Sequence, residues 1–156
     1  MLVISDIDGV LADCSHRLHY LKDKDYDKFY SEKEMSEDYA IASGVSLLKN
    51  LYNESFTAII FLTGRPYKTE AWTRRWLKWR ARFENAEFAT MLMRKNHDYR
   101  PSDVVKVETF QKYLEENPYR GEILFIDDDL KNVVAMEKAV ENCTGILFGT
   151  SRLDLN

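Results

Sequence analysis

Two acids, Asp6 and Asp8, follow a short apolar run at the start of the chain and are separated by one residue. A buried parallel strand releases its chain at the edge where α/β proteins build their sites, so we expect both carboxylates at the mouth of a crevice. Gly9 allows a sharp turn there. Carboxylates this close repel one another unless a cation or a shared proton intervenes. The pair therefore indicates a divalent metal, an acid/base couple or both, or else a solvated strand end.

A hydroxyl, a flexible residue and a cation follow a second apolar run, at Thr63, Gly64 and Arg65. Backbone N–H groups at the start of a helix favour anions, and a guanidinium group binds phosphate oxygens in a bidentate way. This set predicts a phosphate-binding turn. The alternative is an ordinary turn in which Thr63 caps the backbone locally.

Three consecutive acids, residues 127–129, follow a third apolar run. Asp129 suits the N-cap of the next helix, which leaves Asp127 and Asp128 facing the same crevice as the first pair. Carboxylates from two strand ends form a hard-oxygen site for Mg²⁺, which accepts substrate phosphate. No cluster of His and Cys accompanies them, so zinc is not expected.

Lys106 follows the polar stretch 94–103 and lies about one turn inside a predicted helix. From there it can reach back toward a phosphate, although a lysine on a helix is usually solvated. With the acids and Arg65 it completes the parts for phosphoryl transfer, since cations offset the repulsion between a carboxylate and a phosphate dianion. Asp6 suits the nucleophile that forms an aspartyl-phosphate, and Asp8 suits the acid/base.

Apolar, β-branched segments alternate with helical ones, which predicts an α/β fold whose parallel sheet is covered on both faces. The expected strands are Leu2–Ser5, Thr57–Leu62, Phe88–Met93, Glu122–Ile126 and Gly145–Phe148. The expected helices are Gly44–Tyr52, Pro66–Phe83, Ser102–Glu116 and Leu130–Glu141.

Local signals place the helix ends and one buried face. Pro66 suits a first helical turn, and Ser102, like Asp129, suits an N-cap. Four aromatic residues at helical spacing predict a stripe that packs on the sheet. They are Trp72, Trp76, Trp79 and Phe83.

The segment 14–43, between the first predicted strand and the first predicted helix, is rich in tyrosine and charge. It exceeds a usual connection, so we expect a small helical cap over the crevice or a mobile loop. His16, Arg17, His19 and Tyr20 follow the first acids, where they can contact a leaving group or remain surface side chains.

Composition fits one domain spanning 1–156: the chain has 156 residues, 45% hydrophobic and 31% charged, with no apolar run of membrane-spanning length. Asp6 interrupts the opening apolar run, so no signal peptide is expected and the cytoplasm is the default location. Cys14 and Cys143 offer neither a disulfide framework nor a paired metal-ligand spacing.

A net charge of -4 argues against global capture of nucleic acid, although a local basic patch remains possible. Basic residues on one predicted helix form such a run or a solvated face: Arg74, Arg75, Lys78, Arg80 and Arg82.

The order of these motifs resembles the haloacid dehalogenase (HAD) superfamily of phosphotransferases. Residues 6–11 are similar to its first motif, residues 63–65 to its second, Lys106 to its third and residues 127–128 to its fourth. The resemblance implies a Rossmann-like, three-layer αβα sandwich, Mg²⁺ bound by the acids, and Thr63 and Lys106 holding the phosphoryl group. It also implies that Asp8 offers its backbone carbonyl to the metal.

A closer similarity is to the 3′-phosphatase domain of polynucleotide kinase/phosphatase, especially the phage type. It rests on residues 94–106, which include Arg100 as a substrate-binding candidate beside Arg17, and on residues 126–134. Residues 1–156 contain no Gly-x-x-x-x-Gly-Lys-Ser/Thr loop, so we expect no kinase half among them.

These observations predict a Mg²⁺-dependent phosphomonoesterase acting on a polynucleotide 3′ end or a nucleotide. A small-molecule phosphatase is the alternative, and a phospho-receiver switch or non-catalytic phosphate binder is another. Asp8 argues against the receiver, because an acid/base beside the nucleophile promotes hydrolysis. No membrane partner is expected, and the sequence decides neither DNA against RNA nor the oligomeric state.

Overall fold

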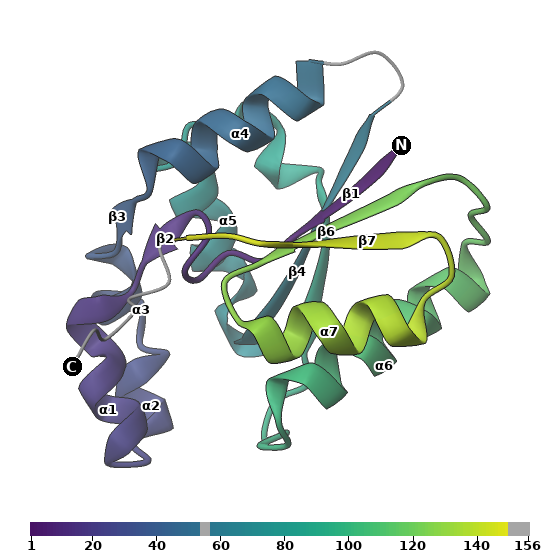
Figure 1. Cartoon of the computed structure of the whole chain (residues 1–156). Coiled ribbons are helices and arrows are strands. Elements are labelled where there is room, and N and C mark those ends of the chain that lie inside the picture. Colours follow the sequence, from purple (N-terminus) through teal and green to yellow (C-terminus); the bar gives the residue numbers. More distant parts are fainter. Residues whose placement is uncertain (54–56, 150–156) are drawn as a thin grey trace, which may run out of the picture.

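A five-stranded parallel sheet lies at the centre of the structure, a computed structural model that describes residues 1–53 and 57–149. Its strand order is β5-β4-β1-β6-β7 (Figure 1). The strands are β1 (Leu2–Ser5), β4 (Ala58–Pro66), β5 (Thr90–Arg94), β6 (Ile123–Asp127) and β7 (Cys143–Leu147). All five apolar segments form strands, which confirms the predicted α/β class.

Helices cover both faces of the sheet. They are α4 (Ala42–Asn53), α5 (Glu70–Trp79), α6 (Ser102–Glu116) and α7 (Leu130–Ala139). In Figure 1, α6 and α7 lie together on one side of the sheet, and α4 and α5 lie on the other. The arrangement is the three-layer sandwich that the motifs imply.

Successive strand residues supply two separate cores. Ile4 of β1 belongs to the buried cluster that contains Phe110 of α6, whereas its neighbour Val3 belongs to the cluster that contains Leu48 of α4 and Leu77 of α5. Successive strand side chains point to opposite faces, so a strand that is apolar at every position must be covered on both. The uninterrupted apolar runs of the sequence are explained by this double burial.

The helix predicted over Pro66–Phe83 is shorter at both ends. Pro66 has extended backbone, with ψ 153°, and pairs with Arg94 at the end of β4, so it is not the proline of a first helical turn. The helix α5 begins at Glu70, after a single 3₁₀ turn. Arg82 takes a left-handed φ of 56°, which ends the helical path.

The aromatic stripe is only partly a core face. Trp76 is buried in the core beneath α5, and Phe83 packs against the same cluster. Trp72 instead donates from Nε1 to Sδ of Met35 at 3.2 Å, outside the sheet. Trp79 is 72% exposed, so the prediction that it packs on the sheet is wrong.

The two predicted N-caps have different outcomes. The Asp129 side chain accepts a hydrogen bond from the backbone N–H of Lys131 at 2.9 Å, as an N-cap should. Helix α6 has the predicted bounds, but its N-cap is Pro101 and Ser102 is its first residue. The expectation that Ser102 caps this helix was wrong.

The segment 14–43 is helical. It contains η1 (Ser15–Arg17), α1 (Leu18–Lys22), α2 (Tyr26–Phe29) and α3 (Glu32–Ser36), and the short antiparallel strands β2 (Ala12–Asp13) and β3 (Tyr39–Ala40) join at its base. It lies beyond the carboxyl ends of β1 and β4 (Figure 1). We call it the insertion; it is in place to cover whatever binds at those strand ends.

Candidate active site

Three adjacent strands bring the motif residues to one edge of the sheet. Ser5 of β1 is in register with Phe61 of β4 and with Ile126 of β6, so the residues that follow them emerge together. A cavity of about 390 Å³ opens at this edge, between the strand ends and the insertion. Its walls include the motif residues Asp6, Asp8, Gly64, Arg100, Lys106 and Asp128.

One buried lysine joins two strand ends on the cavity floor. Lys106 Nζ lies 2.8 Å from Asp6 Oδ2 and 2.6 Å from Asp127 Oδ2. The other oxygen of Asp127 accepts from the backbone N–H of Asp129 and from Nδ2 of Asn132, both at 2.9 Å. Asp127 is therefore fully engaged by protein groups, and Lys106 is a buried cation of the site rather than a solvated surface lysine.

Three carboxylates gather beside this lysine. Oxygens of Asp6, Asp127 and Asp128 lie within 4.8 Å of one another. Among residues 1–53 and 57–149, Lys106 is the one lysine or arginine that forms an ion pair with any of them. Three carboxylates beside one lysine leave an excess of negative charge, which a divalent cation would balance.

The electrostatics of the acids fit a site for a cation. Burial raises the pKa of Asp6 to about 8 even though Lys106 opposes the shift. Burial and the neighbouring Asp127 raise the pKa of Asp128 to about 6. The buried Oδ1 of Asn132, on the same cavity wall, has no hydrogen-bond donor among the described residues. Hard oxygen donors and an orphaned carbonyl fit Mg²⁺ and its water ligands.

Asp8 is held by two buried arginines. Its Oδ1 lies 2.8 Å from Arg17 Nη2 and 2.6 Å from Arg65 Nη2, and its Oδ2 accepts from Arg65 Nε at 3.0 Å. Burial alone would raise the pKa of Asp8, but the guanidinium groups of Arg65 and Arg17 hold it at about 2. Asp8 is thus an ionised carboxylate, 22% exposed, facing the cavity.

The two arginines predicted to bind substrate lie beneath Asp8 instead of facing the cavity. Arg17 and Arg65 are completely buried and both also pair with Asp38, at 2.8 Å and 3.1 Å. Thr73 Oγ1 accepts from Arg65 Nη1 at 3.3 Å. These arginines therefore belong to a buried ion network, and their expected contact with phosphate stays a prediction.

Asp38 is a residue that the sequence reasoning missed. It closes the insertion, is buried, and its backbone carbonyl accepts from Trp76 Nε1 at 3.0 Å. It stands among other acids of the insertion, such as Glu34 and Glu37, and no local signal separates it from them. Its significance comes from the two arginines it bridges.

The second-motif residues and Arg100 occupy different surroundings. Thr63 Oγ1 accepts from the backbone N–H of Arg65 at 3.2 Å, as the local-capping alternative expects, and no residue within 1–53 or 57–149 accepts the proton of this hydroxyl. Gly64 lines the cavity. Arg100 also lines it, with ion pairs to Asp98 at 2.9 Å and Glu108 at 2.8 Å.

Gly9 is required by the close approach of two motif loops. Its φ is +82°, and a Cβ at this position would collide with the carboxylate of Asp128. The glycine therefore lets the loop after β1 pass directly beside the acids after β6.

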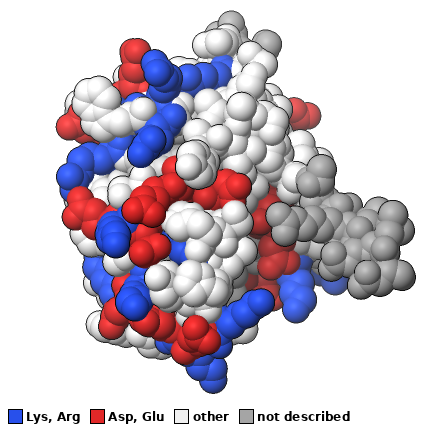
Figure 2. Space-filling model, turned by 90° about the vertical axis from the view of Figure 1, so that its left-hand side faces the viewer, with Lys and Arg blue, Asp and Glu red and all other residues white. Residues whose placement is uncertain are grey.

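The basic run on α5 is largely neutralised. Arg74 binds Glu70 and the carbonyls of the 86–89 turn, and Arg75 pairs with Glu32 of the insertion. Lys78 pairs with Glu87, and Arg80 donates to a carbonyl of α3. Figure 2 shows positive and negative side chains interleaved on the face that carries the insertion. These contacts favour the solvated-face interpretation of the run.

His16 and His19 lie outside the cavity wall, whereas Cys14 is part of it. His16 is exposed, with its Nε2 3.0 Å from the carbonyl of Glu34, and the ring of His19 contacts that of Tyr20 at a tilt of 41°. Cys14 is half-buried in the wall, where burial raises the pKa of its thiol to about 12. A thiol that stays protonated is unreactive and packs like a small apolar side chain.

The chain matches one family of known proteins. A family model described as the polynucleotide kinase PNKP phosphatase domain matches residues 1–143. No curated protein sequence is similar enough to match the chain. None of the helices described is both long and apolar enough to cross a membrane.

Several solved structures share the fold. A chain of the Pnkp1/Rnl/Hen1 RNA repair complex superposes with a TM-score of 0.64 at 22% identity, over 93% of this chain and 42% of that chain. A haloacid dehalogenase-like hydrolase from Streptococcus pneumoniae gives 0.62 at 13% identity, over 88% and 80%. The HAD domain of the effector protein Lem4 from Legionella pneumophila gives 0.55 at 14%, over 98% and 88%. The chain spans less than half the length of the first two solved chains it matches, 42% and 46%.

Proposed function

The chain belongs to the family of the polynucleotide kinase PNKP phosphatase domain, and from this premise we propose that it removes phosphate from a polynucleotide 3′ end or from a nucleotide. It is a phosphoric monoester hydrolase with the HAD fold. The observation that supports the reaction best is the cluster of Asp6, Lys106, Asp127 and Asp128 on the floor of the cavity. The RNA repair complex among the structural neighbours favours a nucleic-acid end as one substrate class.

Asp6 is the proposed nucleophile. Its Oδ1 accepts from the backbone N–H of Ile7 at 2.7 Å and its Oδ2 faces Lys106, so the carboxylate is fixed in orientation. An Asp6 oxygen forms a bond to phosphorus while the ester P–O bond breaks and the alcohol departs. Water then attacks phosphorus, the Asp6–phosphorus bond breaks, and inorganic phosphate leaves with the carboxylate restored. Lys106 and the Thr63 hydroxyl are proposed to hold the phosphoryl oxygens.

Asp8 is the proposed acid/base. A carboxylate with a pKa of about 2 is a weak base for the attacking water and holds no proton to donate at neutral pH. Donation to the departing alcohol in the first step therefore requires the contacts with Arg17 and Arg65 to loosen as the leaving group arrives. We propose that the buried arginines regulate the proton affinity of Asp8 in this way, rather than binding phosphate directly.

The Asp8→Asn variant is expected to form the aspartyl-phosphate but to turn over at least about a hundredfold more slowly, because acid/base catalysis contributes on that scale. Labelled phosphate should remain on acid-quenched protein, whereas wild type retains little. Urea unfolding shows whether the variant remains folded after losing two ion pairs. A folded variant with wild-type turnover would contradict the assignment.

Mg²⁺ is the proposed cofactor, and it would polarise the phosphoryl oxygens and balance the clustered charge. Asp6 and Asp128 would hold it directly, since both line the cavity, whereas Asp127 does not line it and accepts three hydrogen bonds from protein groups. The Asp8 carboxylate lies outside the cluster of three acids, so any contribution from Asp8 would come through its backbone carbonyl, as the family resemblance implies.

Removing divalent ions with a chelator is expected to abolish phosphate release, and Mg²⁺ should restore it. The Asp128→Asn variant should need at least about tenfold more Mg²⁺ for half-maximal activity, since one ligand oxygen loses its charge. An exposed acid outside the cavity provides the matched control, Asp23→Asn. Full activity in chelator, or an unchanged Mg²⁺ requirement in Asp128→Asn, would count against this site.

The proposed function is tested by a phosphate-release screen with Mg²⁺. Its substrates are 3′- and 5′-phosphorylated oligonucleotides of DNA and RNA, mononucleotides and sugar phosphates. Preference for 3′-phosphorylated ends or nucleotides is expected. Release from sugar phosphates alone would overturn the substrate assignment, and no release from any compound would overturn the reaction.

A further inference from the structure

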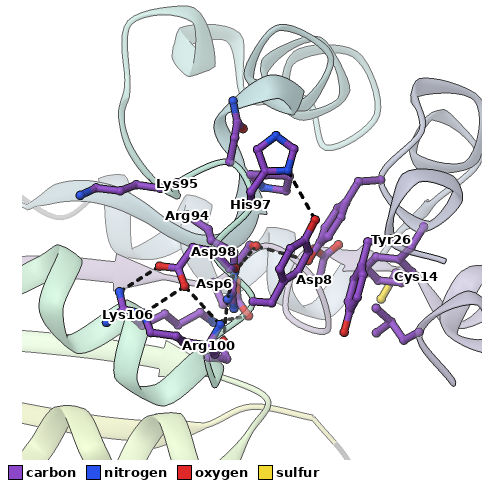
Figure 3. A pocket seen from close by; sticks show the side chains of 18 of the residues that line it. Asp6, Asp8, Cys14, Tyr26, Arg94, Lys95, His97, Asp98, Arg100 and Lys106 are labelled. Atoms are coloured by element: carbon purple, nitrogen blue, oxygen red, sulfur yellow. Dashed lines mark hydrogen bonds and ion pairs between the residues drawn. The ribbon is translucent and has the colours of Figure 1, made fainter. Parts of the chain in front are cut away.

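The cavity has two chemically different ends. Asp6, Asp128 and Lys106 form a charged floor, whereas the insertion and the loop before α6 provide apolar and aromatic side chains. The members of this aromatic end are Leu18, Leu21, Tyr26, Phe29, Tyr30 and Tyr99. In Figure 3, Tyr26 and Cys14 lie on the opposite side of Asp6 and Asp8 from Lys106. A substrate with its phosphate on the floor directs its leaving group toward this end.

Two tyrosines meet across the cavity mouth. The rings of Tyr26 of α2 and Tyr99 of the loop lie 4.9 Å apart between centroids, tilted by 38°. Tyr99 is 63% exposed, so much of its ring has no protein covering it. Exposed aromatic rings at a cavity mouth offer flat apolar faces to a planar ligand.

The loop that carries Tyr99 is anchored beside the motif residues. Arg94 donates from Nε to the Gly64 carbonyl at 3.0 Å, and from Nη1 to the carbonyls of Asp98 at 2.9 Å and Arg100 at 2.7 Å. One guanidinium therefore joins the phosphate-binding turn to the backbone on both sides of Tyr99. The ring stands at a fixed place relative to the floor.

The helix that carries Tyr26 is tied to the same region. Lys68 Nζ binds Asp27 at 2.9 Å, and the Lys68 backbone N–H donates to Asn96 Oδ1 at 2.8 Å. Both tyrosines are thus positioned before any substrate arrives, which lowers the entropic cost of stacking.

We propose, on the basis of the function above, that Tyr99 and Tyr26 stack on the nucleobase of the nucleotide that carries the phosphate. Every base has a flat π-face, so stacking recognises nucleotides without reading sequence. A sugar phosphate has no such face and would leave the aromatic end unused. The tyrosines thereby select nucleotides over other phosphomonoesters and tolerate all four bases.

The test compares 3′-phosphorylated oligonucleotides that differ only in the terminal base, which is either present or replaced by an abasic residue. Wild-type kcat/KM should fall at least about tenfold on the abasic substrate, in line with the usual contribution of base stacking. Tyr99→Ala should lose about as much on the intact substrate, mainly through a higher KM, and lose no more on the abasic one. Tyr99→Phe should retain the preference.

Tyr39→Ala is the matched control, because Tyr39 is exposed and lies outside the cavity wall. It should keep the preference for the intact substrate. Equal kcat/KM of wild type on intact and abasic substrates, with phosphate released from both, would overturn the stacking role while leaving the phosphatase assignment in place. No release from either would count against the proposed function instead. A nucleoside 3′-monophosphate compared with ribose 3-phosphate shows whether one nucleotide suffices for the effect or a longer strand is needed.

Discussion

The Asp6→Asn variant is expected to release phosphate more than about a thousandfold more slowly than wild type. An amide has nearly the size of the carboxylate but cannot supply the anionic oxygen that bonds to phosphorus. Asp6 is also the one acid that faces both Lys106 and the cavity at the end of β1. The measurement is phosphate release under saturating Mg²⁺ from the best substrate of the screen.

The control for this variant separates chemistry from folding. Asp23→Asn makes the same change at an exposed position of the insertion and should retain full activity. Asp6→Asn should still unfold cooperatively in urea, because it removes an acid from a site with excess negative charge. Activity within tenfold of wild type would mean that another group attacks phosphorus, and Asp6 would then be only a metal ligand.

Strand ends are the part of the site that sequence reasoning reaches most directly. Asp6, Thr63 and Asp127 each follow or end an apolar run, and the parallel sheet places those ends side by side. Their proximity follows from topology alone, because parallel strands all end at the same edge. The sequence therefore predicts this meeting point without information on side-chain packing.

Buried pairing is the part that the sequence does not reveal. Arg17 and Arg65 have the residue type and place of phosphate ligands, but both bind two acids instead. Asp8 lies 9 residues from Arg17 and 57 from Arg65 in the sequence. Asp38 lies 21 residues from Arg17 and 27 from Arg65. Which oxygen a guanidinium meets depends on how the insertion folds back over β4. No local pattern encodes that fold-back, so the direction of these side chains needs the structure.

Local rules also failed where the sheet continued beyond its expected end. Pro66 has the residue type of a helix start, yet β4 runs on to Pro66 with a shift of register after Thr63. The pairing with Arg94 outweighs the local preference, because a proline at the end of a strand costs no ladder hydrogen bond. Tertiary pairing thus moved the start of α5 to Glu70.

Replacing Arg65 with methionine is expected to lower the free energy of unfolding by about 3–5 kcal/mol, because it leaves the carboxylates of Asp8 and Asp38 to share the single guanidinium of Arg17. Arg65 is fully buried and makes three hydrogen bonds to Asp8 and Asp38 carboxylate oxygens. Methionine fills much of the volume but carries no charge. Urea unfolding of the variant and wild type measures the difference.

Arg75→Met is the matched control, since the Arg75–Glu32 pair is 61% and 52% exposed and such pairs contribute at most about 1 kcal/mol. Arg65→Lys keeps the charge but loses the planar fork that binds Asp8 through two nitrogens, so its stability should fall between the other two. Phosphate release, measured where Arg65→Met is still folded, reports a second effect. With one guanidinium gone the Asp8 carboxylate loses its fixed orientation, so turnover should fall at least about tenfold even though the pKa of Asp8 rises. A variant as stable as Arg75→Met would show that the network is not held by Arg65. A folded Arg65→Met variant with unchanged turnover would show that the arginines do not regulate Asp8 as proposed.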